Sequence, residues 1–146
     1  MTLYLCSSTV ERLRAFRNAW FQRFARRENI ADAALWEAVM RANQGQVNAD
    51  LAGGVIKQRV ARPGAGRSGG HRTLIFFRVG VRAVFAFGFA KSTRANIGRG
   101  DMADLKMAAK ITLAFTEGEI DKLVAAGTLV EVECNDEDTF TPDLPK

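Results

Sequence analysis

Residues that usually carry catalysis or cross-links are scarce in this sequence. Its 146 residues include two cysteines, one histidine and one tyrosine. Cys6 and Cys134 lie near opposite ends without metal-ligand spacing, so no disulfide framework is expected. One histidine excludes a histidine-rich metal site, and no CxxC, GxSxG or HExxH motif is present. We therefore expect neither a metal nor a cofactor.

Long hydrophobic runs are also missing. No stretch of eighteen apolar residues occurs, and the most hydrophobic region, around 73–90, is interrupted by Arg78 and Arg82. The first residues resemble a short signal sequence, but they lack a basic start and become charged at Glu11 and Arg12. The sequence thus predicts a cytoplasmic protein that does not bind membranes.

Acidic residues are absent from the middle of the chain. Residues 51–100 hold ten lysines and arginines and no aspartate or glutamate, whereas residues 101–146 hold four basic and eleven acidic residues. If the middle segment forms one surface, it should attract a polyanion in a salt-dependent manner. The alternative is that arginines merely cover an exposed sheet face. Ordinary solvated faces mix both signs of charge, which favours the polyanion.

The order of elements predicts one α+β domain over residues 1–131, with 1–14 as an N-terminal extension and 132–146 as an acidic, disordered tail. Asn18 can cap a helix that runs through Arg27, and Asp32 can cap a second helix. C-terminal helices are expected from Asp101 and after the capping box "TEGE" at 116–119. The predicted fold is a helix pair, then an antiparallel sheet of three to four strands, then the C-terminal helices.

Three stretches between the helices predict strands, at 55–62, 71–78 and 81–90. Alternation in the first stretch places Lys57 and Arg59 side by side on one face. In the third, Phe85, Phe87 and Phe89 share a face, which we interpret as core.

The glycine-rich stretch "PGAGRSGG" at 63–70 joins the first two of these strands. A Walker phosphate loop needs a Lys-Ser/Thr pair followed by a helix, and here a strand follows instead. The stretch is therefore interpreted as a turn.

Any chemistry on this basic segment must be performed by lysine, arginine and His71. RNA suits such a site because it carries its own nucleophile, the 2′-hydroxyl. A protein can orient that group and stabilise charge on the phosphate with cations alone. Proton transfer would then fall to a lysine or histidine whose pKa is lowered by crowding with other cations.

Three stretches carry a resemblance to a known family: "WFQRFARRENI", "ADLAGGVIKQRVARPGAGRSGGHRTLIFFR" and "AFGFAKSTRANI". Over residues 15–131 the chain resembles the RelE/HigB-type toxins of bacterial toxin–antitoxin modules. It is similar to the subgroup with the signature K-x-R-x-A-R-P-G-x-G-[KR]-S-G-G-x-R-T. The resemblance implies a RelE-like α+β fold and a metal-independent mRNA interferase, an endoribonuclease that usually cuts messages in the ribosomal A site. It also implies neutralisation by a cognate antitoxin, often a helix-turn-helix protein.

The resemblance assigns roles to individual residues. Lys57 and Arg59 match the basic pair that contacts the scissile phosphate, and Arg72 matches the arginine that stabilises the transition state. The full set of expected catalytic residues is Lys57, Arg59, Arg72, His71, Lys91 and Arg94. Arg62 and Arg67 are expected to contact RNA or the ribosome.

One departure from the family leaves the proton carrier open. The catalytic tyrosine of well-known members would fall near Asn96 and Ile97, which cannot act as acid or base. His71, at the position of another aromatic residue of the family, and Lys57 are the two candidates for proton transfer. His71 could instead replace that aromatic ring in base stacking.

Two other functions fit parts of the pattern. A ParE-like toxin that inhibits gyrase would share the fold without the RNA-cleaving residues, and the presence of Lys57, Arg59 and Arg72 argues against it. A non-catalytic nucleic-acid-binding module would show the same charge segregation without needing those strand positions. Within the family, Arg78 and Arg82 are interpreted as solvated charges without a role.

Overall fold

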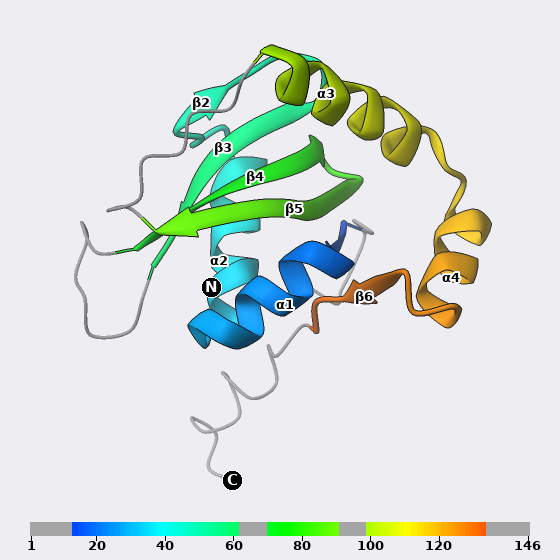
Figure 1. Cartoon of the computed structure of the whole chain (residues 1–146), viewed down its shortest axis with the longest axis horizontal. Coiled ribbons are helices and arrows are strands. Elements are labelled where there is room, and N and C mark those ends of the chain that lie inside the picture. The colour runs from blue at the N-terminus through cyan, green and yellow to red at the C-terminus, as the bar shows by residue number, and fades with distance from the viewer. Residues whose placement is uncertain (1–12, 62–69, 91–98, 134–146) are drawn as a thin grey trace, which may run out of the picture.

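A computed structural model describes residues 13–61, 70–90 and 99–133, which form an α+β fold around one six-stranded sheet (Figure 1). The strand order is β2-β3-β4-β5-β1-β6. The strands are β1 (Arg14–Asn18), β2 (Ala49–Asp50), β3 (Val55–Val60), β4 (His71–Arg78), β5 (Arg82–Ala90) and β6 (Leu129–Glu131). The helices are α1 (Ala19–Glu28), α2 (Asp32–Asn43), α3 (Arg99–Ala114) and α4 (Glu117–Ala125).

The sheet is mixed. Strands β2 to β5 pair in antiparallel fashion, whereas β1 inserts beside β5 in parallel and pairs with β6 on its other side. The β4–β5 hairpin turns at Val79 and Gly80, between the strands predicted at 71–78 and 81–90, and Gly80 has a φ of 73°, which a side chain would strain.

Helices cover both faces of the sheet, and each face has its own apolar core (Figure 1). On one face α1 and α2 pack against Ile56, Ile75 and Phe85. On the other, α3 and α4 pack against Val55, Phe76 and Val84. Helix α1 approaches β5 so closely that a Cβ on Gly88 would lie 2.5 Å from the Phe24 ring. The small residue at this position therefore serves the packing of a helix on the sheet.

Two of the three predicted caps are present. The Asn18 side chain accepts a hydrogen bond from the Phe21 amide, and Thr116 with Glu119 completes a capping box. The prediction for Asp32 was wrong, because Ala31 is the N-cap of α2 and makes no side-chain bond there. The Asp32 carboxylate instead pairs with Arg17 and accepts a hydrogen bond from the Glu133 amide at 2.9 Å.

The strand count also differs from the expected three to four. β1 precedes the helix pair and begins at Arg14, the last residue of the predicted extension. β6 is three residues long, and beyond it the Val132 amide donates to the Ala15 carbonyl at 2.8 Å. Residues 134–146 of the predicted tail lie outside the described residues. Both strands are held by partners far away in the sequence, so local patterns do not reveal them.

Within the described ranges, no helix combines the length and the apolar character needed to span a bilayer.

Candidate nucleic-acid interface

Three predicted site residues lie next to one another on one face of the sheet. Lys57 and Arg59 alternate along β3, and Arg59 stands directly opposite Arg72 on β4. Side chains of directly opposed residues share a face with their Cβ atoms about 4.5–5.5 Å apart. All three residues are partly exposed. We call Lys57, Arg59 and Arg72 the cationic patch.

No carboxylate within the described part of the chain forms an ion pair with Lys57 or Arg72. Like charges directly opposite each other destabilise a sheet.

A buried side chain on the opposite face of β3 anchors the strand that carries Lys57 and Arg59. Gln58 is fully buried, and its Nε2 donates to the Ala38 and Gln46 carbonyls, both at 3.0 Å. Its Oε1 accepts from the Asn48 amide at 3.1 Å. Sequence reasoning missed this anchoring role, although a polar residue on an otherwise apolar strand face was the available signal.

A β-bulge overturns the prediction that Phe85, Phe87 and Phe89 share one face. Ile75 pairs with Phe85 but Leu74 pairs with Phe87, so Ala86 is an extra residue in β5. Phe85 is buried among the residues that pack on α1 and α2, whereas Phe87 packs with the cluster beneath α3. Phe89 lies directly opposite Arg72. The bulge thus brings two partly exposed rings to the face of the cationic patch.

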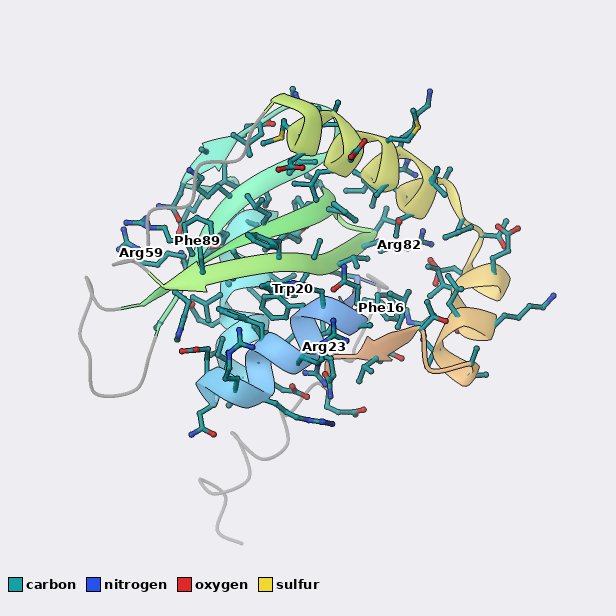
Figure 2. The ribbon with its side chains drawn as sticks, viewed as in Figure 1. Phe16, Trp20, Arg23, Arg59, Arg82 and Phe89 are labelled. Atoms are coloured by element: carbon teal, nitrogen blue, oxygen red, sulfur yellow. The ribbon has the colours of Figure 1, made fainter. Side chains whose placement is uncertain are left out.

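Figure 2 shows Arg59 and Phe89 at the same end of the sheet. Their closeness agrees with the register, in which Arg59, Arg72 and Phe89 form one row across β3, β4 and β5. Lys57, Leu74 and Phe87 form the neighbouring row.

His71 lies on the other face. It pairs with Val60, is 1 % exposed, and packs edge-on against Phe24 with ring centroids 5.5 Å apart. Its Nε2 lies 3.1 Å from Oε1 of Glu28 on α1. The structure therefore does not bring His71 to the cationic patch, and the ring is enclosed between β4 and α1.

Four predicted residues, Arg62, Arg67, Lys91 and Arg94, lie outside the described residues. Of the described residues, Val60, His71 and Ala90 are aligned across β3, β4 and β5, at the end of the sheet where Arg59 and Arg72 lie.

Comparison with models of protein families shows which family the chain belongs to. Residues 13–132 match the family model described as RelE toxin of the RelE/RelB toxin–antitoxin system. The chain belongs to the RelE toxin family. No curated protein sequence matches it. The matched range contains all six strands and all four helices of the described residues. RelE toxins are generally endoribonucleases, and membership implies an antitoxin partner.

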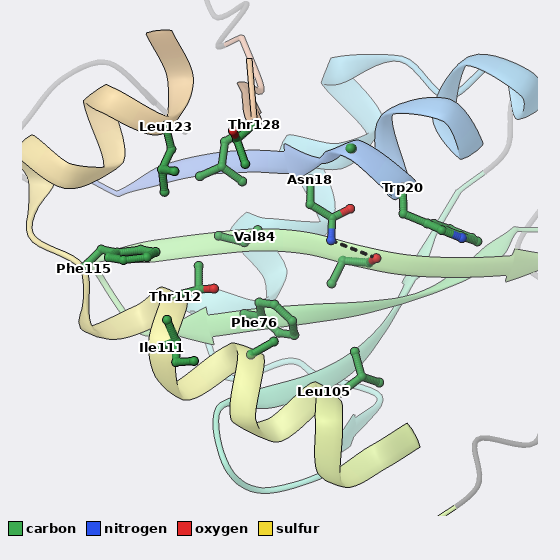
Figure 3. Close-up of a pocket in the computed structure, with 14 residues that line it drawn as sticks. Asn18, Trp20, Phe76, Val84, Leu105, Ile111, Thr112, Phe115, Leu123 and Thr128 are labelled. Carbon is green, nitrogen blue, oxygen red and sulfur yellow. Dashed lines mark hydrogen bonds between the residues drawn. The ribbon is translucent and has the colours of Figure 1, made fainter. Parts of the chain in front are cut away.

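In this RelE-family toxin an apolar groove lies between the sheet and α3, with a volume of about 580 Å³ (Figure 3). Leu105 and Ile111 of α3 line one side, and Phe76 and Val84 of the sheet line another. Trp20 lines the end at α1. Among the described residues, those that line the groove carry no charge. Across the described ranges, His, Cys, Asp and Glu form no group that could hold a metal.

A second charged cluster of the toxin joins α4 to the sheet. Arg82 was predicted to be solvated, but it is 3 % exposed and donates to the Thr112 carbonyl at 2.9 Å and to Glu117 at 2.7 Å. Arg14, its neighbour on β1, also donates to Glu117, at 3.0 Å. Partial burial raises the pKa of Glu117, but the hydrogen bonds from Arg82 and Arg14 outweigh that effect and hold it below the ordinary value of 4.5. Glu117 therefore bridges two adjacent arginines.

Replacing Glu117 with glutamine is expected to lower the free energy of unfolding at neutral pH by about 1–2 kcal/mol. Breaking a fully buried pair costs about 3–5 kcal/mol, but the Glu117 side chain is 54 % exposed and solvent screens part of the interaction. Because the folded-state pKa is lowered, this stability is present above pH 4.5 and disappears as the pH falls through the lowered value.

Denaturant unfolding of parent and variant between pH 3 and pH 7 measures this difference. Glu37→Gln, which removes an exposed i,i+4 pair with Arg41, is the control and should cost only about 0.3–0.5 kcal/mol. A loss for Glu117→Gln that is the same at both ends of the pH range would show that the charge of Glu117 is not what holds α4.

Proposed function

We propose that this toxin is an mRNA interferase that cleaves ribosome-associated messages in the cytoplasm and is neutralised by a cognate antitoxin. The observation that supports the proposal is the cationic patch. Lys57, Arg59 and Arg72 converge on one partly exposed face, and Lys57 and Arg72 form no ion pair within the described ranges.

The patch suits attack of the RNA 2′-hydroxyl on the adjacent phosphate. The 2′-oxygen forms a bond to phosphorus, the bond from phosphorus to the 5′-oxygen breaks, and a 2′,3′-cyclic phosphate and a 5′-hydroxyl result. Negative charge on the non-bridging oxygens is greatest in the transition state. Arg59 and Arg72, as planar donors fixed on neighbouring strands, would stabilise that charge.

Two protons must move: one leaves the 2′-hydroxyl and one reaches the departing 5′-oxygen. We assign the first transfer to the neutral amine form of Lys57, the only lysine of the patch, and the second proton to solvent water. His71 is left out because it is buried on the other face of the sheet. Lys91 and Arg94 are proposed as the remaining catalytic cations, and Arg62 and Arg67 as contacts to RNA or the ribosome.

The antitoxin is proposed to cover the surface formed by residues 51–100. That segment carries ten basic and no acidic residues, so an acidic segment of the partner would complement it. A helix-turn-helix protein that also binds DNA would suit this role.

Incubating the purified toxin with mRNA on programmed ribosomes tests the proposal. We expect new 5′ ends within the message, detected by primer extension, and no effect on DNA gyrase in a supercoiling assay. Gyrase inhibition with intact RNA would point to a ParE-like activity. RNA binding without cleavage would identify a non-catalytic module.

A further inference from the structure

The outer edge of β3 is only partly covered by a strand. β2 pairs with β3 at Ile56 and Lys57. The same register, continued by two residues, would set Val47 opposite Arg59. Val47 instead packs against the core that contains α1 and α2, and β2 does not extend to Arg59. The backbone of Arg59 therefore lies at a strand edge and needs other hydrogen-bond partners there.

Two side chains take the place of the missing strand. The Arg59 amide donates to Oδ1 of Asn48 at 2.8 Å, and the Arg59 carbonyl accepts from Nη2 of Arg41 on α2 at 2.6 Å. Arg41 is oriented by Glu37, one turn earlier, whose Oε2 accepts from the Arg41 Nε at 2.8 Å. Asn48 is held by Gln58, because the Asn48 amide donates to the Gln58 Oε1 at 3.1 Å. Both contacts to Arg59 thus come from residues that have a second anchor.

These contacts determine how closely Arg59 approaches Arg72. Both backbone groups of Arg59 point to the outer edge, so Arg59 and Arg72 form a non-hydrogen-bonded pair. Side chains of such a pair lie closer together than those of a hydrogen-bonded pair. Two like charges at this spacing repel each other and favour outward movement of an edge strand. Asn48 and Arg41 hold the backbone against that movement.

We infer that Asn48 and Arg41 are positioning residues, which place the Arg59 guanidinium beside Arg72 so that both can contact one phosphate. Neither residue needs to touch RNA in this role. Displacing a reacting group by about 1 Å can cost about a hundredfold in rate, so a small movement of the strand edge affects cleavage strongly. The inference rests on the proposed function, because it takes Arg59 as a cation that acts on RNA.

Asn48→Ala tests the inference, with single-turnover cleavage of mRNA on programmed ribosomes as the readout. The contact with Arg59 is exposed, so water replaces part of it, and we expect the rate at saturating toxin to fall about tenfold. The toxin concentration that gives the half-maximal rate should change less than about twofold, because binding of the ground state is retained. Asn48→Asp keeps an oxygen acceptor for the same amide and should recover most of the rate.

Asn43→Ala is the matched control. Oδ1 of Asn43 accepts from the Gly80 amide at 2.7 Å, so this variant removes the same kind of hydrogen bond at the β4–β5 turn. It should lose about as much free energy of unfolding as Asn48→Ala while it cleaves like the parent. Arg41→Gln removes the other contact to Arg59 and should also slow cleavage. It replaces Asn48→Ala if that variant does not fold.

Two further measurements separate positioning from a general loosening of the fold. In an Arg59→Gln background, Asn48→Ala should lower the rate less than about twofold, since both substitutions act through the same guanidinium. Amide hydrogen exchange reports the contact without cleavage. The Arg59 amide should exchange about twofold to tenfold faster in Asn48→Ala, as the net contribution of one hydrogen bond implies. Its exchange should be unchanged in Asn43→Ala.

Equal cleavage rates for the parent and Asn48→Ala would overturn the inference. Equal losses of rate for Asn48→Ala and Asn43→Ala, or an undiminished loss in the Arg59→Gln background, would do the same. An Arg59 amide that exchanges in Asn48→Ala as it does in the parent would rule out the contact itself. A parent toxin that leaves mRNA intact would instead overturn the proposed function, and hydrogen exchange would still decide whether Asn48 holds Arg59.

Discussion

Replacing Arg72 with glutamine is expected to reduce mRNA cleavage by the toxin about 10²- to 10³-fold, the usual cost of removing one donor to a transition-state anion. Arg72 occupies the centre of the row Arg59, Arg72 and Phe89. Glutamine retains a hydrogen-bonding side chain but lacks the charge. Cleavage rates on programmed ribosomes measure the loss, and growth after induction in cells should show the toxicity disappear.

Arg78→Gln is the matched control. It removes the same charge from the same strand, but Arg78 is exposed at the far end of β4, six residues from Arg72. It should cleave like the parent. Both variants should unfold within about 0.5 kcal/mol of the parent, as surface substitutions usually do, and both should still bind the antitoxin. An Arg72→Gln toxin as active as the parent would remove Arg72 from the catalytic residues.

Replacing Lys57 with arginine is expected to lower the rate of cleavage about 10²- to 10⁴-fold, which is the usual contribution of a positioned acid or base. Arginine keeps the positive charge but does not give up its proton in proteins. The variant should therefore bind RNA almost as well as the parent while the chemical step slows. Single-turnover cleavage at saturating toxin separates the two effects.

Lys106→Arg makes the same change on α3, outside the cationic patch, and should leave cleavage unchanged. Full activity of Lys57→Arg would mean that Lys57 acts only as a charge. Proton transfer would then belong to another group, with Lys91 the next candidate by position in the sequence.

Local signals in the sequence were sufficient for much of the fold. The strands that carry Lys57, Arg59 and Arg72 follow from alternation, and the caps at Asn18 and Thr116 follow from the side chains that bond to the first turn of a helix. The proximity of Lys57 and Arg59 needed only a period of two. The cationic patch could be predicted because it lies on strands whose alternation is visible within a few residues of sequence.

The features that were missed depend on distant partners. A single extra residue, Ala86, moved Phe87 and Phe89 to the other face, and nothing in an alternating run marks where a bulge occurs. The burial of Arg82 was missed because its partners, Glu117 and the Thr112 carbonyl, lie at least thirty residues away in the sequence. His71 was a catalytic candidate by position, but pairing with Val60 turns it toward α1 and Glu28.

The central claim is that the cationic patch promotes attack by the 2′-hydroxyl of RNA. The most direct measurement maps cleavage of a ribosome-bound message and repeats it with a single 2′-deoxynucleotide at the 5′ side of the bond that is cut. We predict that cleavage of that bond disappears, while cuts elsewhere persist and the 5′ fragments end in a 2′,3′-cyclic phosphate. Cleavage that continues at the deoxy position would contradict the account, because an external water would then be the nucleophile.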